Sequence, residues 1–183
     1  ETILNGLYRS KLRDYEAVPE GLADEVGDPS RDGLRLVPLK DSLILIKEDG
    51  IWRVTGESER TFSIKPLETT VFGRAPATWA SFDNAAWGLS TQGLVRVTES
   101  GTERISRPID DKIAALLTFP NVETLSHAVA SESDGLYHLG CQLLSSDTKA
   151  TGLWVFNNVT HAWTGPWTKP TKCGHVLFSA DRI

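Results

Sequence analysis

KEDGIWRVTGES, residues 47–58, recurs twice further along the chain, as STQGLVRVTESG (90–101) and ESDGLYHLGC (132–141). Each copy joins a turn that contains glycine to a segment in which apolar and polar residues alternate. Such a segment is typical of a β-strand that follows a tight turn. The three copies therefore predict a repeating, all-β chain.

The turn glycines give the spacing of the copies. Gly50 and Gly93 are 43 residues apart, and Gly135 follows after another 42. A further copy begins in HVLFSADRI (175–183), where Arg182 stands in the glycine's place after 47 residues. A period of this length is typical of β-propeller blades, which cannot bury both faces alone and must stack. We expect an incomplete propeller with repeats of about 42–47 residues.

Short apolar runs around these turns predict the individual strands. Arg53 and Arg96 occupy the same slot in two of them, IWRVT and LVRVT, and we expect both to be solvated or salt-bridged at a sheet surface. The predicted strands cover 34–39, 42–47, 51–55, 61–66, 85–90, 94–98, 102–106, 127–131, 134–140, 152–157 and 161–167.

The chain divides by composition into a lead-in and the repeats. Residues 1–33 mix charged residues with Gly, Pro and Asp and have no apolar period, so we expect turns and extended chain with at most a short helix. From residue 34 onward we expect β-propeller blades. Their predicted bounds are 34–76, 77–120, 121–170 and the start of a further blade at 171–183.

One short connecting helix is predicted between the second and third repeats. Asp110 can cap it, and Ile113, Leu116 and Leu117 fall at helical spacing behind that cap. Pro120 helps to end it.

Composition limits the function classes. The 183 residues carry 19 basic and 24 acidic side chains, a net charge of −5, without a long run of either sign, which does not indicate a nucleic-acid-binding face. No apolar run approaches the roughly 18 residues that a membrane span needs. Because the first residue is Glu1 and Ile183 falls within an apparent strand, we expect a fragment or processed piece of a longer polypeptide.

Cysteine and histidine invite a metal hypothesis. The pairs are His138 with Cys141, and Cys173 with His175. They belong to neighbouring repeats, and the second spacing is unfamiliar for zinc, so we favour polar side chains near strand ends and predict no metal site. Two cysteines do not make a disulfide framework, and two buried thiols are favoured over a bridge.

No catalytic motif stands out, and we predict no catalytic, cofactor-binding or metal-binding residue. The adjacent acidic pairs Glu48-Asp49 and Asp110-Asp111 diverge in a strand or turn, so they read as turn and cap residues. A sialidase-type propeller needs a tyrosine nucleophile among converging arginines and carboxylates. The available tyrosines are Tyr8, Tyr15 and Tyr137.

Aromatic residues are more conspicuous than reactive ones. Trp52 and Tyr137 stand at positions that the repeat makes equivalent, and we expect them to fill space between blades. Trp163 and Trp167 flank a Thr-Gly-Pro turn signal and are either core residues, which we favour, or exposed anchors for a partner.

The stretches RLVPLKDSLILIKEDGIWRVTGE (35–57) and WGLSTQGLVRVTESGTERISRPIDDKI (87–113) resemble the tail nozzle, or tail hub and tubular, proteins of short-tailed bacteriophages. SKLRDYEAVPE (10–20) is similar to the lead-in that precedes the propeller in that family. The resemblance covers most of residues 10–115. Only three full repeats are visible, whereas closed propellers usually have 4–8 blades.

The resemblance implies a structural, non-enzymatic virion component, made in the bacterial host cytoplasm. It implies a homo-oligomeric ring, commonly a hexamer, that contacts neighbouring tail proteins and lets DNA pass without specific binding. The acidic balance is compatible with such a conduit, because sites that bind phosphate backbones are basic. The alternatives are a propeller adaptor that binds a protein or glycan and, more distantly, a sialidase-like glycosidase.

Overall fold

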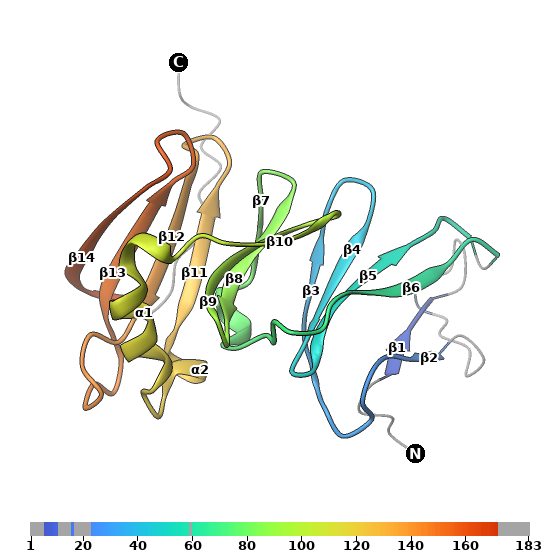
Figure 1. Ribbon diagram of the computed structural model, residues 1–183, viewed down its shortest axis with the longest axis horizontal. Helices are drawn as coiled ribbons and strands as arrows, with labels where there is room; N and C mark the ends of the chain where they lie inside the picture. The colour runs from blue at the N-terminus through green and yellow to red at the C-terminus, as the bar shows by residue number, and fades with distance from the viewer. Residues whose placement is uncertain (1–5, 11–15, 17–22, 59, 172–183) are drawn as a thin grey trace.

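Three four-stranded antiparallel sheets stand side by side along the molecule (Figure 1). The computed structural model describes residues 6–10, 16, 23–58 and 60–171. Each of the three sheets is a simple meander in which the strands pair in chain order. The prediction of an all-β architecture is therefore confirmed.

Sheet 1 and sheet 2 follow the predicted strands closely. Only the first strand of sheet 2 was missed, because β7 has three residues and lacks an apolar run of strand length. Sheet 1 consists of β3 (Gly33–Pro38), β4 (Leu43–Lys47), β5 (Gly50–Thr55) and β6 (Ser63–Glu68). Sheet 2 consists of β7 (Ala80–Phe82), β8 (Ala85–Ser90), β9 (Gly93–Thr98) and β10 (Gly101–Arg104).

Sheet 3 has the longest strands. Its β13 alternates between buried and half-buried positions over eight residues, the pattern of a strand with one covered face. The sheet consists of β11 (His127–Ser131), β12 (Leu136–Cys141), β13 (Ala150–Asn157) and β14 (Ala162–Thr171).

The repeat has a different phase from the one predicted. Gly50 and Gly93 begin the third strand of their sheets, whereas Gly135 precedes β12, a second strand. The equivalence of Gly135 with the other two glycines, and of Tyr137 with Trp52, was therefore wrong. The turns at Gly50 and Gly135 have the same local sequence, Asp-Gly followed by an apolar residue, and only strand order separates them.

The first strands keep the regular interval instead. β3, β7 and β11 begin at Gly33, Ala80 and His127, in two equal steps of 47 residues. The fourth strands are far less regular, since β6, β10 and β14 begin at Ser63, Gly101 and Ala162, in steps of 38 and then 61 residues. β7 lies in contact with both β3 and β11. The spacing is thus conserved where the sheets meet along their first strands.

An aliphatic core joins sheet 1 to sheet 2. Ile44, Ile46 and Ile51 are fully buried and face Val95 and Val97 of sheet 2. Burial of each such side chain contributes on the order of 1.5–3 kcal/mol. This core holds the two sheets face to face.

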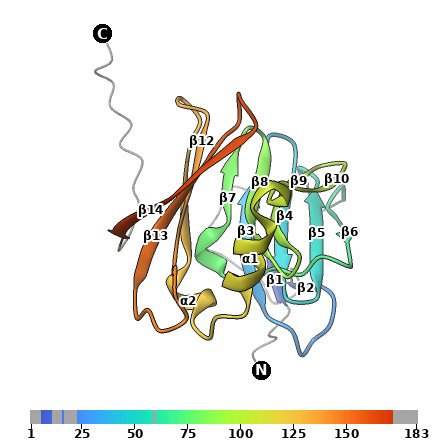
Figure 2. The ribbon, with the colours of Figure 1, turned by 60° about the vertical axis from the view of Figure 1, so that its left-hand side comes forward.

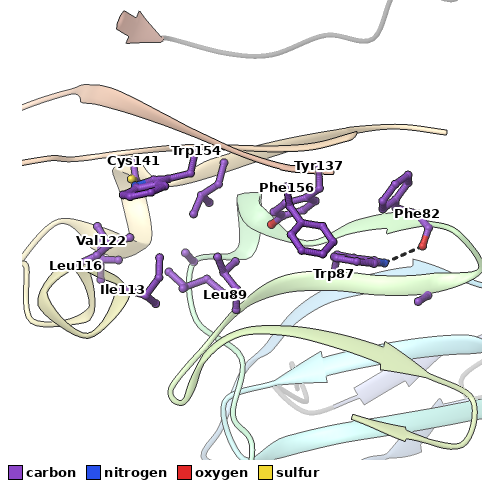
Figure 3. Close-up of a cluster of buried hydrophobic side chains, with 14 residues drawn as sticks. Phe82, Trp87, Leu89, Ile113, Leu116, Val122, Tyr137, Cys141, Trp154 and Phe156 are labelled. Atoms are coloured by element: carbon purple, nitrogen blue, oxygen red, sulfur yellow. Dashed lines mark hydrogen bonds between the residues drawn. The ribbon is translucent and has the colours of Figure 1, made fainter. Parts of the chain in front are cut away.

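An aromatic core joins sheet 2 to sheet 3 (Figure 3). Trp87 lies at its centre, with its ring centroid 5.9 Å from that of Tyr137 and 5.3 Å from that of Phe156. The indole N–H of Trp87 donates to the Phe82 carbonyl at 2.8 Å, so its one polar atom is satisfied inside the core. Large aromatic rings thus fill the space between sheets 2 and 3, whereas isoleucine and valine fill the space between sheets 1 and 2.

In the described part of the chain, two α-helices follow sheet 2 (Figure 2). The predicted helix is confirmed as α1 (Asp110–Leu117), while α2 (Val122–Leu125) was not predicted. Asp110 does not cap α1, because the residue before the helix is Ile109 and no side chain caps it. The Asp110 carboxylate instead pairs with Arg104 at 2.7 Å. Among the described residues, no helix is long and apolar enough to cross a membrane.

The lead-in covers the outer face of sheet 1. β1 (Gly6–Tyr8) and β2 (Ala23–Glu25) pair antiparallel, beside sheet 1 in Figure 1. Leu7 and Val26 pack with Leu45 and Val54 of sheet 1 in a third, smaller apolar cluster. The hairpin therefore covers one face of sheet 1, in the same way that sheet 1 covers one face of sheet 2.

A buried lysine fastens this lead-in. Lys47 at the end of β4 is 1% exposed, and its ammonium group donates to the carbonyls of Val26 at 2.6 Å, Arg31 at 3.0 Å and Asp28 at 3.3 Å. Asp49 lies 3.6 Å from the same nitrogen. A buried charge is tolerated only when it is hydrogen-bonded and paired, as this one is.

Candidate interaction surface

The reactive residues suggested by the sequence do not converge. His138 and Cys141 lie on one strand, β12, but three positions apart, so their side chains point to opposite faces of sheet 3. Cys141 is buried in the aromatic core, and burial raises the pKa of its thiol to about 12. Cys173 and His175 lie outside the described residues. Within the described part of the chain, no group of three or more potential metal ligands occurs.

Tyr137 is enclosed rather than poised for chemistry. Its side chain is fully buried and its hydroxyl donates to the Thr78 carbonyl at 2.8 Å. Burial also raises the pKa of this phenol, so the nucleophilic phenolate is disfavoured. The interaction instead ties sheet 3 to the turn that precedes sheet 2. Tyr8 is exposed on β1, and Tyr15 lies outside the described residues.

Of the two arginines in the same slot, Arg96 forms the predicted salt bridge, whereas Arg53 hydrogen-bonds a backbone carbonyl of the neighbouring sheet. Arg53 donates to the Glu99 carbonyl at 2.7 Å and so links sheet 1 to sheet 2. Arg96 pairs with Asp83 at 3.2 Å and lies over the Trp87 ring, 5.8 Å from its centroid. Both side chains point toward the following sheet.

A cleft of about 490 Å³ opens between sheets 1 and 2, at the end where β4 turns into β5. It combines a partly exposed aromatic ring, Phe72, with charges of both signs. Arg74 forms an ion pair with Glu123 at 2.9 Å, and Arg31 lies 3.8 Å from Glu48. The charges thus largely neutralise one another across the cleft.

A second, largely apolar surface lies on the side of sheet 3 that faces away from sheet 2. Because Tyr137 and Leu139 of β12 point into the aromatic core, the alternate side chain, His138, points outward. Register places Val129 and Val155 on either side of His138, and Trp167 opposite Leu153. We call this surface the outer face of sheet 3; it consists of Val129, Leu136, His138, Leu153, Val155, Thr164 and Trp167.

The outer face of sheet 3 is uncharged at neutral pH. The seven side chains include no Asp, Glu, Lys or Arg, and Trp167 is 53% exposed while Leu153 and Val155 are half-buried. Burial lowers the pKa of His138, and nearby Asp134 acts in the opposite direction. The face therefore offers a neutral, largely apolar surface.

Of the two tryptophans, Trp163 is a core residue and Trp167 is exposed, so each of the two interpretations holds for one of them. Trp163 packs on the aromatic core, with its indole N–H donating to the Ile105 carbonyl at 2.9 Å. Trp167 is exposed on β14, as expected for an anchor. The sequence suggested both residues but not which was which, since the register shift between β13 and β14 sets the difference.

The same face is buried in the other two sheets. Between second and third strands, Ile44 pairs with Arg53 in sheet 1 and Trp87 pairs with Arg96 in sheet 2. The corresponding pair in sheet 3 is His138 with Val155. Ile44 is covered by sheet 2 and Trp87 by sheet 3, so the outer face of sheet 3 corresponds to the faces that are buried in sheets 1 and 2.

The sequence matches no known family model and no curated protein.

Proposed function

We propose that this chain is a structural assembly module, built from consecutive blades of a larger β-propeller, with the lead-in at 1–33 and blades at 34–76, 77–120 and 121–170. The observation that supports this most is the stacking of three equivalent sheets through two continuous cores, with their first strands 47 residues apart. Such an array is rigid and repetitive, and its ends are the natural places for assembly.

The resemblance of the sequence to phage tail proteins suggests where such a module would act. The proposed role is that of a tail nozzle or hub component of a virion, non-enzymatic, assembling as a ring around the DNA exit channel and contacting neighbouring tail proteins. A net charge of −5 is compatible with DNA passing without specific binding. The enclosure of Tyr137 argues against the glycosidase alternative, because that residue would have to reach substrate.

Particle mass and shape test the proposal. Mass photometry and negative-stain imaging of the purified protein should show a closed ring of several copies, six being the expected number. A monomer at all concentrations that retains a defined ligand would instead favour the adaptor.

The adaptor alternative has one observation of its own, the cleft between sheets 1 and 2. Phe72 offers a surface for stacking and Arg74 a donor for carboxylate or sugar hydroxyl groups. Screening a glycan and peptide array with the wild-type protein and with Phe72→Ala tests it. Binding that Phe72→Ala abolishes would support an adaptor, and equal signals from both proteins would count against this cleft.

A further inference from the structure

Each of the three sheets packs one face against the segment that precedes it on the chain. Sheet 1 covers this face on sheet 2, and sheet 2 covers it on sheet 3. On sheet 1 the covering segment is the lead-in, which contributes Leu7 and Val26. The third strands of the three sheets supply equivalent side chains to this face: Trp52 and Val54, Val95 and Val97, and Trp154 and Phe156.

One position on this face differs in charge between the sheets. The last residue of each second strand pairs with a glycine of the third strand: Lys47 with Gly50, Ser90 with Gly93, and Cys141 with Gly152. Where another sheet covers the face, this residue is small and uncharged. Ser90 is fully buried, and Cys141 lies in the aromatic core (Figure 3). Where the lead-in covers the face, the residue is Lys47, which alternation places on the same side of β4 as Leu43 and Leu45.

The lead-in satisfies this buried charge in a way that a sheet would not. The Lys47 ammonium group donates to three backbone carbonyls of residues 26–31, an irregular segment that follows β2. A sheet presents side chains on its face and keeps its own carbonyls in the ladder between strands. A second sheet packed here would therefore leave Lys47 with Asp49 alone inside an apolar contact, which is strongly unfavourable.

We propose that Lys47 determines what covers the outer face of sheet 1: it selects the lead-in and excludes the same face of a second copy of this chain. Without the charge, Leu45, Trp52 and Val54 form an apolar sheet face of the kind that packs against another sheet twice within this chain. Two copies would then pair through it in a symmetric contact. This inference deepens the assembly role and rests on the equivalence of the blades in the proposed function.

Lys47→Ser in the full chain tests the proposal, because it introduces the residue that sheet 2 has at the equivalent position. Hydrogen exchange of the amides at 23–33 should accelerate by roughly a hundredfold, since the lead-in loses a buried charged contact. Sedimentation velocity over a range of concentrations should show a species of twice the wild-type mass. Continued protection of the β8 and β9 amides is the control for folding.

The matched control is Leu7→Asp, which weakens the lead-in but keeps Lys47. Leu7 lies opposite Asp24 in the hairpin, so the new carboxylate also meets a like charge. Exchange at 23–33 should accelerate by roughly tenfold, because the lead-in opens more often, while the mass stays that of the wild type. If Lys47→Ser loses the protection of β8 and β9, the neutral and longer Lys47→Gln replaces it with the same expectations.

Three results would overturn the proposal. Equal association of the lysine variant and Leu7→Asp would mean that the charge at position 47 does not exclude a second copy. A wild-type mass of the lysine variant at every concentration would mean that this face does not accept another sheet. Unchanged exchange at 23–33 would mean that Lys47 does not hold the lead-in. The wild-type mass tests the ring and the change in mass tests Lys47, so the two failures are distinguishable.

Discussion

The outer faces of sheet 1 and sheet 3 are the two ends of the same stack, and they are finished differently. At sheet 1 the β1–β2 hairpin covers Leu45 and Val54, and Lys47 fastens the following loop through three carbonyls. At sheet 3, Trp167 is exposed and Val155 only half-buried. Among the described residues, one end of the stack is therefore covered by the lead-in, and the other presents partly exposed apolar side chains. We call the first the closed end and the second the open end.

The largest effect is expected from removing the interactions of Lys47, which hold the lead-in on sheet 1. Lys47→Met should lower the free energy of unfolding by about 3 kcal/mol, because it leaves buried carbonyls and Asp49 without their partner. Urea denaturation followed by tryptophan fluorescence measures it. Lys65→Met, on an exposed position of neighbouring β6, is the matched control and should change stability by less than about 0.5 kcal/mol. Equal effects of the two variants would remove Lys47 as the fastening.

The same substitution at one valine on each end compares how much stability burial contributes at the two ends. Val54→Ala, at a site only 4% exposed, should cost about 2 kcal/mol, since it leaves a cavity under the hairpin. Val155→Ala on the outer face of sheet 3 should cost about 0.5 kcal/mol. Thermal unfolding by calorimetry compares them. A larger loss at Val155 than at Val54 would mean that the open end is covered more completely than the closed one.

A smaller effect is expected where the hairpin meets water. Arg9 lies over the Phe62 ring, 4.0 Å from its centroid, and pairs with Asp24 at 2.8 Å. Arg9→Gln should lower stability by about 1 kcal/mol, combining a partly exposed ion pair with a cation–π contact. Hydrogen exchange of the β1–β2 amides locates the change. Uniform exchange changes across sheets 2 and 3 would contradict a role confined to the hairpin.

The smallest expected effect is a pH dependence at the open end. Burial lowers the pKa of His138 in the folded protein below its ordinary value of 6.5, so the unfolded chain binds the proton more readily. The stability contributed by neutral His138 is therefore present above pH 6.5 and declines as the pH falls through the window just below it. Denaturation of wild type and His138→Gln at several pH values should give a stability difference that changes across this window, because only the wild type loses stability there as the pH falls. Parallel curves would show that His138 does not titrate differently on folding.

Local sequence was sufficient for most strands but not for their order. SLILIK and AAWGLS are apolar at consecutive positions and became the doubly covered strands β4 and β8. Asp49-Gly50 and Asp134-Gly135 look alike, yet they turn between different strand pairs, because β12 and β13 are joined by a long segment without glycine. The residues of a turn predict that the chain reverses there. They do not predict which two strands of the sheet the turn joins.

The buried Lys47 and the outer face of sheet 3 were also beyond prediction from local sequence. Lys47 closes an apolar strand, where a lysine is usually solvated, and its acceptors are carbonyls from an irregular loop some twenty residues earlier. Nothing in either segment alone indicates the contact. The face formed by Val129, His138 and Val155 becomes visible only once strand register is known, since the three residues come from three strands.

The unequal spacing of first and fourth strands has a practical consequence for how such a chain can change. With first strands fixed at 47 residues and fourth strands drifting from 38 to 61, length variation is absorbed at the periphery of each sheet and leaves the line of first strands undisturbed. An insertion between the later strands of one sheet would therefore leave the contacts of β7 with β3 and β11 in place.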